Sequence, residues 1–382
     1  MVSAHRLAEK VIESVHGPQG ETYEGLLRDA SEAASRGDLY TAKEAIAKAL
    51  EHKDMGNSPT AYMMHGALCL QQGEWLPAKK SLAKAYKRAP GDWQINTNLA
   101  SACLHLGKYD LAVQHAGKAC QLQPRVAAAR LILIQALRGM ATESEESEKK
   151  GVLTAALNAG KEALRIYASK EPQPAGANSE PPMCAVGEVL VDLGELDEAW
   201  SLAVQAADAA GQSGPLMGNA CILAGRVQEA AGQYEKALDA YQKATMQQSS
   251  GSHERATALR TNLITKALRH ALPAVEGDVF ITTYPKSGTT WMQQVVCMLS
   301  GEPADVDIQM RAPYIEAAIA TSIFSLERLR RLKPPRLFKT HAGWEDLPVA
   351  GCTDNAPPRH AKVVVVVRDP RDVMVSLYFH SK

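Results

Sequence analysis

A group of residues suited to binding a phosphate or sulfate stands at positions 283–291, in the segment Thr-Tyr-Pro-Lys-Ser-Gly-Thr-Thr-Trp. Lys286 supplies a mobile positive charge, and Gly288 lets a ligand approach the backbone closely. A β-rich apolar stretch at 278–283 precedes the loop, and residues 289–299 have the apolar spacing of a helix. A loop that enters a helix in this way presents backbone N–H groups and the positive end of the helix dipole. The segment therefore predicts an anion site.

A second anion contact is predicted at the end of an apolar run. Residues 361–367 end in five consecutive valines, a nearly continuous β-branched run as expected for a parallel strand buried on both faces. Arg368 follows at once, and the next predicted helix carries Ser376. Ligands of open α/β sheets gather at the carboxyl ends of strands, where a guanidinium can bind a phosphate through two hydrogen bonds. For Arg371 and Asp372, a structural ion pair near the helix start is the simpler interpretation.

A candidate general base stands between these two segments. His341 ends the stretch Pro-Arg-Leu-Phe-Lys-Thr-His, and we expect a short strand at 336–340. A single histidine is usually an ordinary surface or core residue, but its position between two anion-binding segments favours a role in proton transfer. Lys339 lies two residues earlier on the same side of the strand, so it points toward the same site.

The segment at 283–291 resembles the 5′-phosphosulfate loop of the cytosolic-type sulfotransferases, which use 3′-phosphoadenosine 5′-phosphosulfate (PAPS). The resemblance implies that Lys286 contacts the oxygen that bridges the phosphate and the sulfuryl group. It also implies that Trp291 packs against adenine, for which a core position in the helix is the alternative. The 5′-phosphate would be held by Ser287, Gly288, Thr289 and Thr290. A nucleotide triphosphatase loop is less favoured, because Lys286 precedes the only glycine of the segment.

The other two segments resemble motifs of the same family. Arg368 and Ser376 keep the spacing of its 3′-phosphate motif, with Asp369 where the family often has asparagine. The segment ending at His341 resembles the PR-x-x-KTH stretch that carries the catalytic base. The resemblance implies transfer of a sulfuryl group to a hydroxyl or amine. His341 would remove the acceptor proton, Lys286 would stabilise the leaving oxygen, Lys339 would complete the catalytic set, and no metal would be needed.

A repeat of 34 residues organises the part of the chain that precedes these motifs. Four pairs keep this spacing in one register: Gly73 and Gly107, Ala78 and Ala112, Ala85 and Ala119, and Pro90 and Pro124. A turn glycine, small residues where helices touch, and a proline after the second helix describe an antiparallel helix pair. The pattern resembles the tetratricopeptide repeat (TPR), with weaker copies around positions 37 and 194 and a better one around position 232.

The predicted fold class is multidomain: an all-α TPR-like solenoid over 1–271, followed by a partial α/β, P-loop-like parallel-sheet domain over 277–382. Loops are predicted near 142–150, which is rich in Ser and Glu, and near 170–182, which holds four prolines. The sulfotransferase resemblance covers only 277–382 and lacks the family's later glycine-rich nucleotide contact. We therefore expect a fragment or a truncated domain.

Composition limits the classes of partner. Lys plus Arg and Asp plus Glu both number 42 in 382 residues, so no overall charge draws the protein to nucleic acid or to an anionic membrane. Seven scattered cysteines without metal-ligand spacing predict reduced thiols. We expect a cytoplasmic protein without a signal peptide or membrane span.

Three functions remain open at this point. The first is a PAPS-dependent sulfotransferase whose TPR repeats dock a protein or the substrate on their concave face. The second is a TPR interaction or scaffold protein with an inactive sulfotransferase remnant. The third, a phosphate-loop kinase, is weaker because no acidic magnesium ligand follows a second strand in the usual way. The acceptor, the TPR ligand and the oligomeric state cannot be predicted from the sequence.

Overall fold

The computed structural model describes residues 22–52, 58–169, 181–211, 214–247, 254–284, 287–321, 323–342, 347 and 361–380. In 254–261 and 377–380 the description covers the backbone alone. The chain divides into two compact units, Met1–Val189 and Leu190–Lys382. We predicted a domain boundary between 271 and 277, and this stays a prediction.

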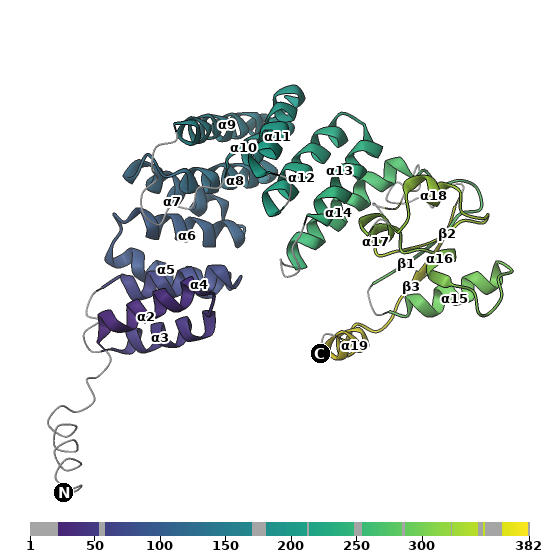
Figure 1. Ribbon diagram of the computed structural model, residues 1–382, viewed down its shortest axis with the longest axis horizontal. Helices are drawn as coiled ribbons and strands as arrows, with labels where there is room; N and C mark the ends of the chain where they lie inside the picture. Colours follow the sequence, from purple (N-terminus) through teal and green to yellow (C-terminus); the bar gives the residue numbers. More distant parts are fainter. Residues whose placement is uncertain are drawn as a thin grey trace, which may run out of the picture. The chain divides into compact units, whose positions relative to one another are not determined.

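Helices dominate the first two thirds of the chain, and a small sheet appears only near its end (Figure 1). The helices are α2 (Tyr23–Ser35), α3 (Leu39–Glu51), α4 (Thr60–Gln71), α5 (Trp75–Arg88), α6 (Trp93–His105), α7 (Tyr109–Leu122), α8 (Ala127–Glu143), α9 (Glu146–Ala168), α10 (Met183–Leu193), α11 (Leu196–Ala210), α12 (Pro215–Ala230), α13 (Tyr234–Met246), α14 (Glu254–Ala271), α15 (Thr289–Leu299), α16 (Ile308–Arg311), α17 (Ile315–Ala320), α18 (Leu326–Arg330) and α19 (Pro370–His380). The strands are β1 (Val279–Thr283), β2 (Leu337–Thr340) and β3 (Lys362–Val366).

The helices of the N-terminal unit stack in pairs, from α2 with α3 to α8 with α9 (Figure 1). The chain turns between paired helices at glycines in the left-handed region, with φ of +74° at Gly73 and +66° at Gly107. A side chain at either position would be strained, which explains the glycine in each repeat. The alanines of the 34-residue pattern are fully buried between helices: Ala78, Ala85, Ala112 and Ala119. The solenoid predicted from the repeat is confirmed.

A second small position of the repeat lies seven residues before the turn glycine. A Cβ atom on Gly66 would lie 2.4 Å from Cγ of Leu82, and one on Gly225 would lie 2.3 Å from a ring atom of Tyr241. Leu82 and Tyr241 are both fully buried in the second helix of their pair. Glycine at these sites therefore lets the two helices approach closely, because any larger side chain would overlap a buried neighbour.

The loop predicted at 142–150 is absent, since helix covers most of this stretch. Only Ser144 and Glu145 separate α8 from α9, and both have extended backbones. Glu146 and Glu148 lie in the first turn of α9, where negative charge stabilises a helix through its dipole. The acidic composition that suggested a loop instead favours a helix start. Residues 170–180 of the second predicted loop lie outside the described residues.

The C-terminal unit contains a parallel sheet with strand order β2-β1-β3. Val279 of β1 pairs in register with Leu337 on one side and with Lys362 on the other. The parallel α/β arrangement predicted from the sequence is confirmed. We also expected β3 to be buried on both faces, and this is wrong for the described part of the chain, where β3 is an edge strand and Val365 is 61% exposed.

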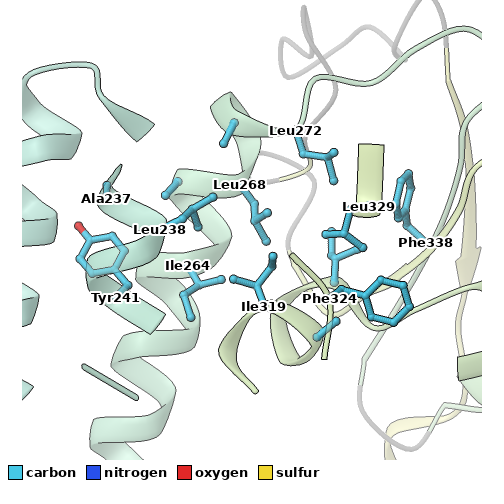
Figure 2. Close-up of a cluster of buried hydrophobic side chains, with 14 of the residues drawn as sticks. Ala237, Leu238, Tyr241, Ile264, Leu268, Leu272, Ile319, Phe324, Leu329 and Phe338 are labelled. Carbon is cyan, nitrogen blue, oxygen red and sulfur yellow. The ribbon is translucent and has the colours of Figure 1, made fainter. Parts of the chain in front are cut away.

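A single hydrophobic core joins the last repeat helices to the sheet region of the C-terminal unit. Figure 2 shows Tyr241 of α13 and Ile264 and Leu268 of α14 on one side of this core, with Ile319 and Phe338 on the other. The side-chain amide of Gln242 also donates to the carbonyl oxygen of Ile319 at 2.9 Å. Within this unit, α13 and α14 are therefore part of the support for α17.

Four basic side chains of the stretch 328–336 form ion pairs with acidic residues of the same chain. Arg330 pairs with Glu235 at 2.6 Å, Arg331 with Glu327 at 2.7 Å, and Lys333 with Glu302 at 2.8 Å. Arg336 is buried and binds both carboxylate oxygens of Asp278 at 2.8 and 2.5 Å. This last pair joins the start of β2 to the start of β1.

Removal of the Arg336 guanidinium should therefore destabilise the C-terminal unit. In Arg336→Ala the Asp278 carboxylate remains buried without its partner, so we expect the free energy of unfolding to fall by about 3–5 kcal/mol. The measurement is urea unfolding followed by circular dichroism. Arg331→Ala is the matched control, because its pair with Glu327 is exposed and contributes less than about 1 kcal/mol. An equal decrease in the free energy of unfolding in the two variants would contradict this prediction.

Two further properties apply to the described residues of both units. Among the described residues, no helix has the length and apolarity needed to cross a bilayer. The six cysteines that lie in the described part of the chain are free thiols. Burial raises the pKa of the Cys69 thiol to about 11, which disfavours its reactive thiolate form.

Candidate active site

The loop predicted to bind an anion leads from the end of β1 into α15. Pro285 and Lys286 lie outside the described residues, so the placement of this lysine remains a prediction. Gly288 has φ +100° and directly precedes the first turn of α15. No side chain from a described residue caps this turn. Since the first N–H groups of a helix have no acceptor within the helix, this turn suits an anionic ligand.

Buried hydroxyl groups fix the two ends of this loop. Thr283, the last residue of β1, and Thr289, the first residue of α15, are hydrogen-bonded to each other through their Oγ1 atoms. Ser287 is buried, and its backbone N–H donates to the carbonyl oxygen of Tyr284 at 3.2 Å. The described residues at the two ends of the loop are thus joined by side-chain and backbone hydrogen bonds, which reduces the entropy cost of ordering them on binding.

His341 follows β2 directly and contacts the end of β1. Its Nδ1 atom lies 2.7 Å from the backbone carbonyl oxygen of Thr283. Because a carbonyl oxygen can only accept a hydrogen bond, Nδ1 carries the proton and the lone pair remains on Nε2. The ring of Tyr314 packs edge-on against the imidazole, with the two centroids 5.0 Å apart. The histidine is therefore held in the tautomer that makes Nε2 a base.

The environment of His341 also favours its neutral form. Burial lowers the pKa of the imidazole, the Thr283 carbonyl acts in the opposite direction, and the charge of Lys339 lowers the pKa further. The net shift is downward from the ordinary value. The ring is therefore uncharged at pH 7, as a general base must be.

This shift gives a pH prediction. Any reaction that needs the Nε2 lone pair should lose rate on the acid side only below the ordinary histidine pKa of about 6.5, because protonation of His341 is suppressed. The measurement is the pH profile of kcat/KM, or the NMR titration of the His341 ring in the free protein. A titration midpoint above about 6.5 would contradict the assigned environment.

Arg368 lies at the carboxyl end of β3, as the sequence predicted. Its side chain is 42% exposed, and its Nε atom lies 4.0 Å from a carboxylate oxygen of Asp372 in the first turn of α19. Arg371 pairs instead with Asp369, at 3.0 Å. The ion pair of Arg368 is long and exposed, so it contributes little, and a phosphate could compete for the guanidinium.

A cavity of about 580 Å³ brings these elements together at the carboxyl ends of the strands. Ser287 reaches it from the anion loop, His341 from the end of β2, and Arg368 from the end of β3. Its apolar wall includes Val365 and Val366 of β3, Val367 directly after the strand, and Val373 and Met374 of α19. Among the described residues, no cluster of His, Cys, Asp or Glu side chains is suited to a metal ion.

Other predicted site residues do not belong to the wall of this cavity. The ammonium group of Lys339 lies over the ring of Tyr314, 5.0 Å from its centroid. Trp291 is 69% exposed on α15, so the alternative of a core position for it is wrong in the described structure. Thr290 is exposed in the first turn of α15, and Ser376 is half-buried on α19. Their predicted roles in nucleotide binding stay predictions.

Several residues of the site were not assigned a role from the sequence. Thr283 fixes both the loop and the histidine, and Tyr314 packs against the histidine ring. Thr282 and Val373 line the cavity. Thr283 is the first residue of the loop segment 283–291, so its position in that motif could have identified it as a site residue. Tyr314 comes from a separate segment that only the fold places beside β2.

Comparison with protein families agrees with this geometry. A family model described as "Sulfotransferase domain" matches residues 276–382, which contain all three strands and the entire cavity wall. The C-terminal part of this chain therefore matches the sulfotransferase domain. A second model, described as "Tetratricopeptide repeat", matches residues 70–127 and 185–253. The sulfotransferase segment thus follows TPR repeats, as the sequence predicted.

Curated relatives match through the sulfotransferase segment. Sulfotransferase 2B1 of Rattus norvegicus is 42% identical over 113 residues, which are 28% of this chain and 30% of that protein. Sulfotransferase 2A1 of Homo sapiens is 36% identical over 110 residues, which are 28% and 35% of the two chains. This chain therefore spans about a third of the length of these relatives. A thermophilic TPR protein of Thermus thermophilus aligns with 54% of this chain and 99% of its own, at 22% identity and a TM-score of 0.45.

Proposed function

We propose that the protein transfers a sulfuryl group from PAPS to a hydroxyl or amine of an acceptor. The observation that carries the proposal is the convergence of three groups on one cavity: the anion loop, the Arg368 guanidinium and the His341 imidazole. An anion loop alone would fit many phosphate ligands. A second cationic group at a neighbouring strand end fits a nucleotide with two separate phosphates, and a neutral histidine beside them adds a base.

The described residues fit the chemistry of this donor. The uncapped first turn of α15, with Gly288 before it, offers N–H groups to the 5′-phosphate. Arg368, whose existing ion pair is long and exposed, is suited to the 3′-phosphate. Trp291 is exposed and can stack on the adenine ring. Thr289, Thr290 and Ser376 complete the proposed contacts.

The proposed reaction needs a base on one side of the sulfur and a positive charge on the other. His341 takes the proton of the acceptor through Nε2, while its Nδ1–H stays bonded to the Thr283 carbonyl. The acceptor oxygen or nitrogen forms the new bond to sulfur as the bond from sulfur to the phosphate oxygen breaks. Lys286 stabilises the negative charge that develops on that oxygen. Burial lowers the pKa of His341 and so favours its neutral form, and the charge of Lys339 adds to this effect.

A transfer assay tests this proposal. The protein is incubated with PAPS that carries a radiolabelled sulfuryl group and with a panel of phenol, steroid, carbohydrate and peptide acceptors. We expect label on at least one acceptor, and its loss in Lys286→Ala. Label that appears at the same rate in wild type and Lys286→Ala, or on none of the acceptors, would count against an active transferase and favour a scaffold with an inactive remnant.

We further propose that the TPR repeats dock a protein partner or the acceptor. A cavity of about 300 Å³ in the N-terminal unit is lined by the first helices of three successive pairs, including Met63, Trp93, Asn98 and Ile132. Its mixture of apolar and amide side chains suits an extended peptide, whose backbone needs hydrogen-bond partners.

A cytoplasmic location remains our expectation.

A further inference from the structure

One buried acid of the C-terminal unit has no part in the mechanism above. Glu316 lies in the first turn of α17 and is 1% exposed. Its Oε1 atom accepts a hydrogen bond from the side-chain hydroxyl of Thr340, the last residue of β2. Its Oε2 atom is buried without a hydrogen-bond partner among the described residues. A carboxyl group kept in such a place costs stability, so its retention calls for a reason.

The Thr340 hydroxyl, which is bonded to Glu316, also accepts a hydrogen bond from the backbone next to His341. Thr340 Oγ1 receives the backbone N–H of Ala342 at 2.9 Å. The carbonyl oxygen of Ala342 accepts from the side chain of Thr282 at 3.0 Å. His341 lies between Thr340 and Ala342, so its backbone is held on both sides. Glu316 orients the Thr340 hydroxyl, because the hydroxyl proton points to Oε1 while a lone pair of the same oxygen accepts the Ala342 N–H.

The helix that carries Glu316 is fixed at both of its ends. At its C-terminal end, Ile319 packs in the core with α13 and α14, and its carbonyl oxygen accepts from Gln242 (Figure 2). At its N-terminal end, Tyr314 forms a bridge with Lys339 of β2 and packs its ring against His341. Contacts at both ends of α17 therefore hold Glu316 in a fixed position. Precise placement of a reacting group such as the His341 imidazole requires such a rigid element.

We propose that Glu316 is a positioning residue for His341: it orients the Thr340 hydroxyl, and through it the Ala342 peptide, so that the imidazole keeps its bond to the Thr283 carbonyl. The proposal deepens the proposed function and rests on the role of His341 as base. Glu316 itself touches neither the cavity nor a reacting atom.

The charge state of Glu316 agrees with a role in hydrogen bonding. Burial raises the pKa of its carboxyl to about 7, against the lowering effects of the Thr340 hydroxyl and the Lys339 charge. Among the described residues, the titratable side chains beside this region also include Tyr314, which packs against the neutral His341. Near pH 7 a large share of the molecules thus carries a neutral carboxyl, which glutamine mimics. Glu316→Gln should keep the bond to Thr340, whereas Glu316→Leu should lose it.

The test reads the tautomer of His341 directly, by NMR of the full chain labelled in its histidine rings. The His341 signal is assigned by its loss in His341→Gln. The variants are Glu316→Gln, Glu316→Leu and Thr340→Val, compared with wild type. Thr321→Val is the matched control, because it removes a hydroxyl at the end of the same helix that bonds only within the helix, to Ala317. The tautomer is measured without nucleotide or acceptor, so the result does not depend on turnover.

We expect wild type, Glu316→Gln and Thr321→Val to hold the proton on Nδ1, and Glu316→Leu and Thr340→Val to show a mixture of tautomers. If turnover is measured, kcat should fall by about 10- to 100-fold in the last two variants, while the affinity for adenosine 3′,5′-bisphosphate stays unchanged. An unaltered tautomer in Thr340→Val would overturn the proposal, even if Glu316→Leu fails to fold. A tautomer that responds as expected in a protein without transferase activity would leave the positioning role intact and count against the proposed function alone.

Discussion

His341→Ala should lower the rate of sulfuryl transfer by about 100- to 10,000-fold, the usual contribution of a general base. The substitution removes Nε2, the ring nitrogen that keeps its lone pair because Nδ1 donates to the Thr283 carbonyl 2.7 Å away. The measurement is the rate of transfer from radiolabelled PAPS to an acceptor in a protein that contains residues 1–382.

Two controls separate loss of the base from loss of the fold. The affinity of His341→Ala for adenosine 3′,5′-bisphosphate should equal that of wild type, because the phosphates are assigned to the α15 turn and to Arg368. His270→Ala makes the same change at a histidine that stacks on Tyr234, with the ring centroids 4.2 Å apart, and should leave the rate unchanged. Transfer by His341→Ala at the wild-type rate would remove the histidine from the mechanism.

Arg368→Ala should weaken the binding of adenosine 3′,5′-bisphosphate by about 10- to 150-fold. This range corresponds to the loss of a charge-assisted hydrogen bond, about 1.5–3 kcal/mol. The affinity for adenosine 5′-monophosphate should change much less, because that nucleotide lacks the 3′-phosphate. Calorimetric titration of both ligands measures the difference.

Arg371→Ala is the matched control for this prediction. Arg371 also stands at the start of α19, but its side chain is 89% exposed and its guanidinium pairs with Asp369 at 3.0 Å. It should leave both affinities unchanged. Equal weakening of the two nucleotides in Arg368→Ala would mean that this arginine acts through overall charge and not through the 3′-phosphate.

Local patterns predicted most of the fold. The 34-residue spacing marks glycines with positive φ and alanines in tight helix contacts. Few other residues tolerate a positive φ or are small enough for such contacts. The three strands and α15 were predicted within a residue or so of their observed bounds, since apolar runs and the loop before the helix are local signals. The loop predicted at 142–150 was wrong, because Ser and Glu are as common at the start of a helix as in a loop.

What the sequence could not predict depends on contacts between distant segments. Glu316 lies 24 residues before Thr340, and no local pattern distinguishes a carboxyl that is buried against a strand end from an exposed helical one. The exposure of Val365 depends on which strand takes the edge of the sheet, a choice that apolarity alone does not make. The core shared by α13, α14 and α17 likewise unites repeat helices with a segment of another motif.

The central claim is that the cavity at the strand ends binds a 3′-phosphoadenosine nucleotide. Calorimetric titration of the wild-type protein with adenosine 3′,5′-bisphosphate and, separately, with ATP tests it most directly. We predict saturable binding of one adenosine 3′,5′-bisphosphate per chain, much tighter than the binding of ATP and lost in Lys286→Ala. Preference for ATP, or no binding of adenosine 3′,5′-bisphosphate to the folded protein, would contradict the account.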